Sequence, residues 1–408
     1  MNPFSAPYLH RPVSIRRSMN LVLLALLPGI LVYSLLITPA LLVQLSIASA
    51  SAILFEALLL YWRGQGVRER LSDHSALITA SLIALTFPPL SPWWLTVIGV
   101  FFAIVIAKQL YGGLGQNPFN PAMIAFAVCI ISFPALMSQW PTQGLNLPFL
   151  QQAEIIFGLA PRLDALTSAT PLDAIKTALK MEIPYNSVQE LLMGQNLHGA
   201  FAGRGWEWVA TAYLCGGIFL LIMGVISWRV PFAFMAGMSA IALVCWLIDP
   251  SRFADPLFHL FSGGTMLGAF FIATDPVTGC ATPRGKLIFG AGAGILAYLI
   301  RVFGSFPDGI AFAILIMNMA APMLDLYCQP RVFGALPSMP VSHPSLKAGA
   351  CARPVVSHPS LKAGASSPQV RGAFGAIKTT CLAHPAINGE ACARPVVKRD
   401  GESERETP

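Results

Sequence analysis

The chain is long, strongly apolar and poor in charge. It has 408 residues, of which 55% are hydrophobic and 11% charged, with a formal net charge of +7. Soluble domains carry about 25% charged residues, so this composition excludes an ordinary soluble protein and indicates a multi-pass membrane protein. The basic residues lie between apolar runs, where they act as topology signals, and we expect no nucleic-acid partner. The eight cysteines have no metal-ligand spacing, so we expect no metal site.

The apolar runs predict about ten membrane-spanning helices, because a helix needs roughly 20 apolar residues to cross the hydrocarbon core. The runs lie at about 19–38, 42–62, 74–88, 92–109, 121–138, 207–227, 231–249, 256–274, 286–304 and 309–327. Basic residues gather in the loops on one side of this arrangement, which places both termini in the cytoplasm. These residues are Arg11, Arg16, Arg17, Arg63, Arg68, Arg70, Lys108, Arg229, Arg284 and Lys286.

The spans divide into two sets of five. Because five is an odd number, the second set starts on the opposite side of the membrane and is inverted relative to the first. The third span of each set is short and ends in proline, from Ser75 to Pro88 and from Ser262 to Pro276. This pattern predicts an all-α polytopic membrane protein of two inverted five-helix repeats with broken third helices, similar to urea transporters. The alternative is two ordinary short helices.

The predicted organisation has four parts. Residues 1–138 form the first membrane repeat, 139–206 an external, periplasmic loop, and 207–334 the second membrane repeat. Residues 335–408 form a Pro/Ala-rich tail, in which short segments recur, and we expect it to be disordered and cytoplasmic.

Thr170 is the most informative hydroxyl of the external loop. It precedes Pro171 and lies three residues before Asp173, a spacing typical of a helix that begins with threonine as the N-cap. A plain cap is the interpretation that the pattern alone favours. The same geometry also suits a phosphate, because the free N–H groups of the first turn face the cap.

The segment that ends at Thr170 resembles the flavinylation motif of the RnfD/NqrB family of membrane flavoproteins. In that motif, a dedicated flavin transferase joins FMN to the last threonine through a phosphoester. The resemblance implies covalent FMN on Thr170. Ser168 stands where the family usually has glycine, and we expect the modification to survive this change. The other motif residues are Asp164, Thr167 and Ala169.

Four further segments resemble the same family over residues 10–334. They are 83–92, 108–122, 271–285 and 300–325, and the last, with Phe306-Pro-Asp-Gly309, is similar to the RnfD branch. The resemblance implies a second, non-covalent flavin such as riboflavin. Asn120, Thr274 and Asp275 are candidates for lining its site, although Asp275 can instead cap a helix or hold a turn. The glycines of 112–115 predict a tight turn rather than a nucleotide loop.

Glu56 lies within the second predicted span, where a carboxyl costs a few kcal/mol and needs a protein or water partner. Its position resembles that of an acidic residue in the ion pathway of NqrB-like proteins. The alternative is a protonated or hydrogen-bonded glutamate near the inner boundary.

The resemblance implies a membrane electron-transfer subunit of an Rnf-type complex in a bacterial inner membrane. Such a complex couples electron transfer between ferredoxin and NAD to Na⁺ or H⁺ translocation, and the partners would be the A, B, C, E and G subunits within the lipid bilayer. Flavin would supply the redox chemistry, so we expect no catalytic acid, base or nucleophile. The alternatives are an NqrB-like subunit of a Na⁺-pumping quinone reductase and a solute channel or transporter.

Overall fold

The computed structural model describes residues 14–142, 147–161, 167–181, 205–306 and 308–329. These residues form helices, turns and one isolated β-bridge, between Pro141 and Thr167. The predicted all-α fold class is confirmed for this part of the chain. Asp164 and the predicted tail at 335–408 lie outside the described residues.

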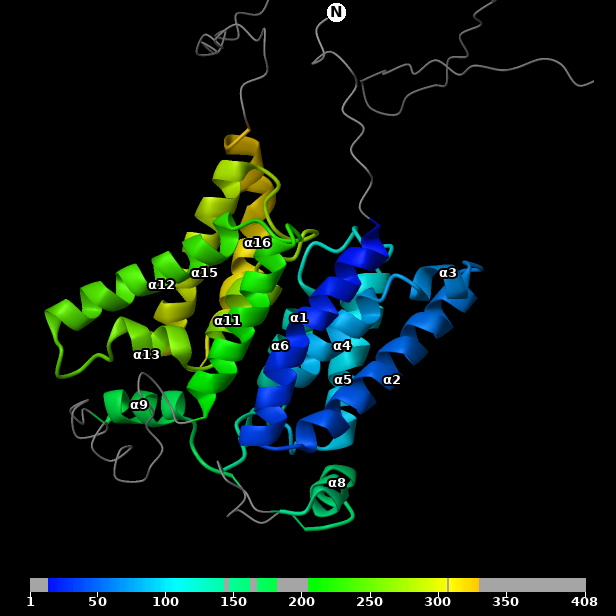
Figure 1. The fold of residues 1–408 in the computed structure, drawn as a ribbon, viewed down its shortest axis with the longest axis horizontal. Coiled ribbons are helices and arrows are strands. Elements are labelled where there is room, and N and C mark those ends of the chain that lie inside the picture. Colours follow the sequence, from blue (N-terminus) through cyan, green and yellow to red (C-terminus); the bar gives the residue numbers. More distant parts are fainter. Residues whose placement is uncertain (1–13, 143–146, 162–166, 182–204, 307, 330–408) are drawn as a thin grey trace, which may run out of the picture. The chain divides into compact units, whose positions relative to one another are not determined.

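The helices of the two halves follow the predicted order (Figure 1). The first half contains α1 (Ile15–Leu36), α2 (Ala40–Trp62), α3 (Val67–Leu71), α4 (Ser75–Thr86), α5 (Trp93–Phe101), its π-helical continuation η1 (Phe102–Gln109), α6 (Pro121–Ser132) and α7 (Pro134–Met137). The connecting segment contains α8 (Phe149–Phe157) and α9 (Pro171–Lys180). The second half contains α11 (Trp206–Ile222), α12 (Arg229–Ile248), α13 (Pro256–Phe261), α14 (Thr265–Leu267), the π-helical η3 (Gly268–Ile272), α15 (Pro283–Phe303) and α16 (Ile310–Tyr327).

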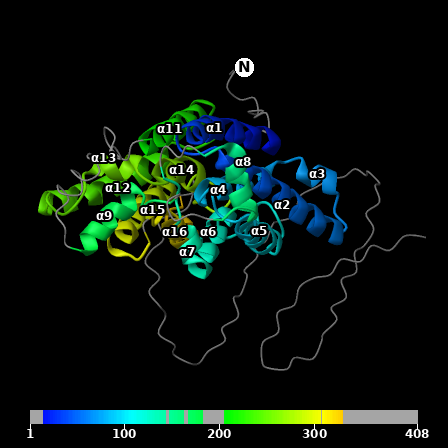
Figure 2. The same cartoon turned by 90° about the horizontal axis from the view of Figure 1, so that it is seen from below.

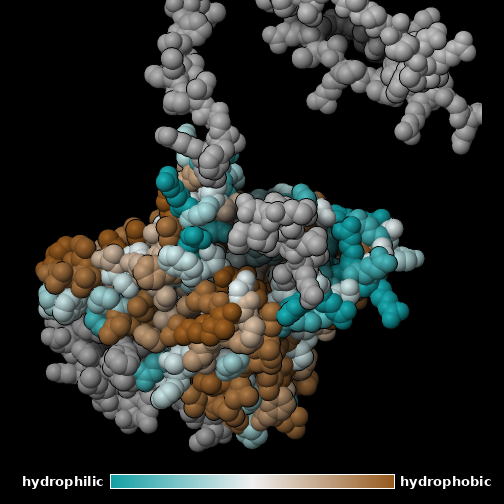
Figure 3. Space-filling view, turned by 45° about the horizontal axis from the view of Figure 1, so that its top comes forward, coloured by the Kyte–Doolittle hydropathy of each residue, from teal (hydrophilic) through white to brown (hydrophobic). Residues whose placement is uncertain are grey.

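The outer surface of these helices is apolar, as a lipid-facing surface must be. Among the described residues, five helices are long and apolar enough to cross a membrane, and four more apolar helices are shorter. Hydrophobic side chains gather in broad patches over the helices, whereas hydrophilic residues gather mainly at one margin of the view (Figure 3). Along α1, Leu24, Leu27, Leu31 and Leu35 are all exposed. The chain is therefore a multi-pass membrane protein.

Each half has a break before its short third helix. In the first half, residues 72–74 separate α3 from α4, and in the second half, residues 262–264 separate α13 from α14. His74 and Gly263 both have φ of 62° at these breaks, so the chain turns in the left-handed region before each short helix starts. The apolar run 256–274 is consequently two helical pieces rather than one continuous span. The run 74–88, in contrast, holds the one short helix α4, and α3 belongs to the polar segment before it. The third helix is thus short in both halves and is divided within its apolar run in the second.

The two halves use the same helix contacts and meet along α1 and α11 (Figures 1 and 2). In the first half α2 packs on α4 and α5, and in the second half α12 packs on α13 and α15. Glycines bring α12 and α15 close together. A Cβ on Gly290 would lie 2.6 Å from the Val230 oxygen, and one on Gly237 would lie 2.5 Å from the Ala291 oxygen. Small residues at such contacts let membrane helices approach closely and gain packing energy.

Candidate functional site

The flavinylation-like segment is held against the chain that follows α7. Thr167 forms the β-bridge with Pro141, and the Ser168 N–H donates to the Trp140 oxygen at 3.0 Å. His74 is the one non-glycine residue with positive φ in the described chain, so Ser168 has an ordinary backbone conformation. A serine at the usual glycine position therefore introduces no backbone strain here.

Thr170 caps α9, as the sequence predicts. Its hydroxyl oxygen accepts from the Asp173 N–H at 3.2 Å and its hydroxyl donates to Asp173 Oδ2 at 2.7 Å. Pro171 occupies the first helical position, where its missing N–H costs no hydrogen bond. The start of α9 is therefore fixed by local chemistry.

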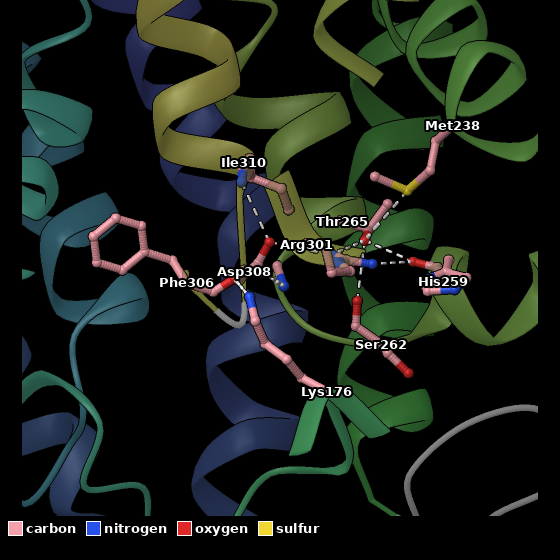
Figure 4. Close-up of polar contacts among 10 residues, drawn as sticks. Lys176, Met238, His259, Ser262, Thr265, Arg301, Phe306, Asp308 and Ile310 are labelled. Atoms are coloured by element: carbon pink, nitrogen blue, oxygen red, sulfur yellow. Dashed lines mark hydrogen bonds and ion pairs between the residues drawn. The ribbon is translucent and has the colours of Figure 1, made fainter. Parts of the chain in front are cut away.

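Contacts along α9 join it to the second half (Figure 4). Leu172 is buried with Ala254 and Phe258. Lys176 Nζ donates to the Phe306 oxygen in the loop before α16, and burial, followed by the charge of Lys180, lowers the pKa of Lys176 to about 8. These contacts hold Thr170 in place beside the break between α13 and α14.

A cavity of about 120 Å³ opens beside Thr170. Aromatic rings form much of its wall, and three of them are linked: Trp140 contacts Trp206 edge-on at 5.7 Å, and Trp206 contacts Tyr33 edge-on at 5.7 Å. Polar groups line the side nearest the break. We call this space the Thr170 cavity; its lining includes Tyr33, Phe126, Trp140, Thr170, Asp173, Trp206, Tyr213, Ser262, Gly263, Gly264 and Asp308.

A buried arginine anchors the break beside this cavity (Figure 4). Arg301, in the last turn of α15, donates to Thr265 Oγ1 at 3.0 Å, to Asp308 Oδ1 at 3.1 Å and to the His259 oxygen at 2.9 Å. Asp308 in turn accepts from the Gly264 N–H at 2.9 Å and the Ile310 N–H at 3.3 Å. The pair therefore joins α13, α14, α15 and α16 at one point.

Unpartnered polar atoms concentrate at the same place. Buried polar groups in folded proteins are nearly always hydrogen-bonded, so exceptions mark candidate ligand or water contacts. Ser262 Oγ is buried, lines the Thr170 cavity and has no partner. The described residues contain five unpartnered buried side-chain atoms, and four of them lie near the break. Besides Ser262 Oγ, these are His259 Nδ1, Tyr298 OH and Arg301 Nε.

A second cavity, of about 260 Å³, contains the other predicted flavin residues. Asn120, Thr274 and Asp275 all line it, although they come from different halves of the chain. All three also have structural roles, and Thr274 Oγ1 donates to the Phe270 oxygen at 2.6 Å. Asn120 caps α6 by accepting from the Ala122 N–H at 3.0 Å, and Asp275 accepts from Thr278 Oγ1 at 3.0 Å. We call this space the Asn120 cavity.

Glu56 has a partner that the sequence does not reveal. Lys108 Nζ lies 2.6 Å from Glu56 Oε1 and 2.7 Å from Ser75 Oγ, and Gln109 Nε2 donates to the same Glu56 oxygen at 2.8 Å. Lys108 is buried and lines the Asn120 cavity, so it is not the loop cation that the charge pattern predicts. A lysine at the end of an apolar run is the one sequence signal that could have found this pair.

The two cavities are built in corresponding ways. The Thr170 cavity is bounded by the start of the second short helix, at Ser262–Gly264, and by the end of the first, at Leu85 and Thr86. The Asn120 cavity is bounded by the start of the first short helix, at Ser75, and by the end of the second, at Thr274. Lys108 and Arg301 also correspond, because each donates to the hydroxyl on the first residue of a short helix. This correspondence is what an inverted repeat predicts.

The fold and the paired cavities define a class: an all-α membrane protein with two polar sites between inverted halves. Comparison with known proteins gives the family. The profile of the NQR2, RnfD, RnfE family matches residues 3–334, and the chain belongs to that family. The family resemblance of the sequence motifs is thereby confirmed.

Relatives in several enterobacteria are similar to this chain over most of its length. The D subunit of the ion-translocating oxidoreductase complex of Yersinia pseudotuberculosis is 47% identical over 345 residues, which cover 81% of this chain and 97% of the relative. The proteins of the same name from Escherichia coli and Pectobacterium atrosepticum are 47% and 46% identical, each again covering 81% of this chain and 97% of the relative.

Proposed function

We propose that this protein is the D subunit of an Rnf-type ion-translocating oxidoreductase complex and carries FMN on Thr170. The observation that carries the proposal is the position of Thr170. Its hydroxyl stands at the rim of an aromatic-lined cavity, inside a motif that resembles a flavin attachment site. The names of the relatives support the complex, and the cavity supports the cofactor.

The residues around Thr170 suit FMN. A phosphate on the Thr170 oxygen would face the free N–H groups of the first turn of α9, which favour an anion. The rings of Trp140, Trp206 and Tyr33 suit a flat aromatic ring, and Ser262 Oγ offers it an unused hydrogen bond. The cavity is smaller than the roughly 300 Å³ at which ligand pockets usually begin, so it would enclose the flavin only in part. Bound FMN would supply the reversible electron transfer.

The Asn120 cavity suits a second flavin held without a covalent bond, such as riboflavin. Its wall carries amide, hydroxyl and carboxyl groups at Asn120, Thr274 and Asp275, beside the apolar rings of Phe270 and Phe271. A few polar groups in a mostly apolar wall are typical of a small-molecule site. Tyr213, on the wall of the Thr170 cavity, contacts Phe271, on the wall of the Asn120 cavity, with ring centroids 6.0 Å apart. The two sites therefore share a thin aromatic partition.

The wider role follows from the family and from the charge pattern. We propose that the complex transfers electrons between ferredoxin and NAD and couples this to Na⁺ or H⁺ movement across a bacterial inner membrane. The A, B, C, E and G subunits would be its partners, and a flavin transferase would modify Thr170 on the periplasmic side. Both termini would be cytoplasmic. Glu56, paired with Lys108, would belong to the ion pathway.

The test is covalent flavin fluorescence. The protein is produced with a flavin transferase, denatured and run on a gel, together with Thr170→Ala and, as a matched control, Thr167→Ala. We expect fluorescence in the wild type, none in Thr170→Ala, and a signal that persists in Thr167→Ala even if it is weaker. A dark wild-type band would overturn the proposal, and a bright Thr170→Ala band would move the attachment to another residue.

The alternative of a quinone-reducing NqrB-like subunit is less well supported. The family profile covers both branches, but the relatives from Yersinia, Escherichia and Pectobacterium are all named as the D subunit of an ion-translocating oxidoreductase complex. Quinone reduction by the isolated complex would restore this alternative.

A further inference from the structure

We propose that Asp173 is the base that receives the proton of the Thr170 hydroxyl when FMN is attached. This inference rests on the proposed attachment of FMN to Thr170. It assigns to this chain, rather than to the transferase alone, a catalytic group for its own modification.

The hydrogen bonds of the Thr170 hydroxyl carry the inference. An N-cap threonine needs only to accept a hydrogen bond from the first turn, and Thr170 does so from the Asp173 N–H at 3.2 Å. Its own proton is free to point elsewhere, yet the hydroxyl donates to Asp173 Oδ2 at 2.7 Å. This is the O–H to carboxylate geometry in which a base activates a hydroxyl nucleophile.

The same geometry leaves one lone pair of the oxygen available for attack. Of the two lone pairs, one accepts from the Asp173 N–H. The other has no partner among the described residues and is free to meet an incoming phosphorus. The N–H remains in place to stabilise the negative charge that develops on the oxygen as the proton leaves.

The chemical step balances with a flavin donor whose FMN phosphate is part of a phosphoanhydride, as it is in FAD. Thr170 Oγ1 forms a bond to the FMN phosphorus while the phosphoanhydride bond breaks. AMP leaves with the bonding electron pair, and the hydroxyl proton passes to Asp173 Oδ2. No group is oxidised or reduced. The transferase would position the donor and neutralise its phosphates.

Thr170 and Asp173 are held in place by the contacts of α9 with the second half, as well as by their hydrogen bonds to each other. Leu172 lies between them in sequence and is buried against the second half, and Lys176 is bonded to the Phe306 oxygen one turn further along. The charged groups that face Asp173 are Lys176 on its own helix and, from the second half, Asp308 in the wall of the same cavity with Arg301 behind it. Asp308 makes its hydrogen bonds to Arg301, Gly264 and Ile310. Asp173 is therefore the carboxylate that is bonded to the nucleophile.

The experiment measures the rate at which the purified full-length protein gains covalent flavin from FAD, with a flavin transferase and Mg²⁺. The variants are Asp173→Asn, which keeps the backbone cap but cannot take a proton, and Asp173→Glu. Because general bases contribute about 10²- to 10⁴-fold, we expect Asp173→Asn to slow attachment about 100-fold or more. We expect Asp173→Glu to restore part of the rate.

A control separates this role from a merely structural one. Ala174→Gly weakens the first turns of α9, because glycine is a poor helix former, but leaves the carboxylate intact. We expect its rate to stay within a few-fold of the wild type. At each pH, rates are divided by the wild-type rate, which removes the pH dependence of the transferase. The Asp173→Asn ratio should rise with pH, since hydroxide replaces the missing base, whereas the Ala174→Gly ratio should stay flat.

The outcomes are distinct. A wild-type protein that gains no flavin would overturn both the attachment and the role of Asp173. Normal attachment to the wild type with an equal rate in Asp173→Asn would overturn only the role of Asp173. The role of Asp173 would also be overturned if Ala174→Gly and Asp173→Asn slowed attachment equally and both rate ratios were independent of pH.

Discussion

Gly263 is the residue at which α9, the Thr170 cavity and the broken helix meet. Its φ of 62° lies in the left-handed region, and a Cβ would lie 2.6 Å from both Asp308 Oδ2 and Leu172 Cδ1. Gly264, its neighbour, has φ of −85°, and a Cβ there would be 3.5 Å from the nearest atom, again Asp308 Oδ2. Adjacent glycines therefore differ in what a methyl group would disturb.

We predict that Gly263→Ala destabilises the protein by about 1–3 kcal/mol, the usual cost of overpacking or of a strained residue. The reason is that the added methyl pushes Leu172 and Asp308 away from Gly263 and weakens the packing of α9 against the second half. Gly264→Ala is the matched control and should change stability by less than about 1 kcal/mol. Thermal unfolding in detergent measures both. Equal loss in the two variants would show that the Leu172–Gly263 contact does not hold α9.

At the scale of single elements, the local sequence predicts where helices start and end. It does not predict which residues pair over long distances in the chain. Thr170, Pro171 and Asp173 lie within four consecutive positions, so the start of α9 could be predicted from side-chain and backbone chemistry alone. The prolines after Thr86 and Thr274 likewise indicated where the short helices end. The Glu56–Lys108 ion pair could not be predicted, because its members are 52 residues apart and only the fold brings them together.

The Glu56–Lys108 pair gives the prediction at this scale. Both side chains are at most 4% exposed, so removing one charge leaves the other buried and unpaired. We predict that Lys108→Met costs about 3–5 kcal/mol of stability. The double variant Lys108→Met with Glu56→Gln should recover a large part of that loss, because no charge is then stranded. Unfolding of the single and double variants in detergent tests this as a double-mutant cycle. A double variant no more stable than Lys108→Met would contradict the assigned pairing.

At the scale of the whole membrane unit, the inverted repeat explains why two cavities exist and why their residues come from both halves. Each cavity combines the start of one short helix with the end of the other, so neither half could form a site alone. The sequence indicated the repeat through the two Pro-stopped segments. It could not show that Ser262 and Asp308 would join Thr170 at one cavity, because these residues are distant in the chain and only the fold brings them together.

The two proposed flavins would occupy separately built sites, so we predict that they can be lost one at a time. Asn120→Asp keeps the cap of α6, since aspartate is as good an N-cap as asparagine. It removes the amide that donates to the Ile272 oxygen at 3.4 Å and adds a negative charge to the wall of the Asn120 cavity. We predict that this variant loses the flavin that denaturation releases but keeps covalent fluorescence on Thr170. Thr170→Ala should show the reverse pattern.

Flavin content is measured in the supernatant and the pellet after acid precipitation of each purified variant. Loss of both flavins from Asn120→Asp, in a protein that still unfolds at the wild-type temperature, would mean that the two cavities are filled as one site.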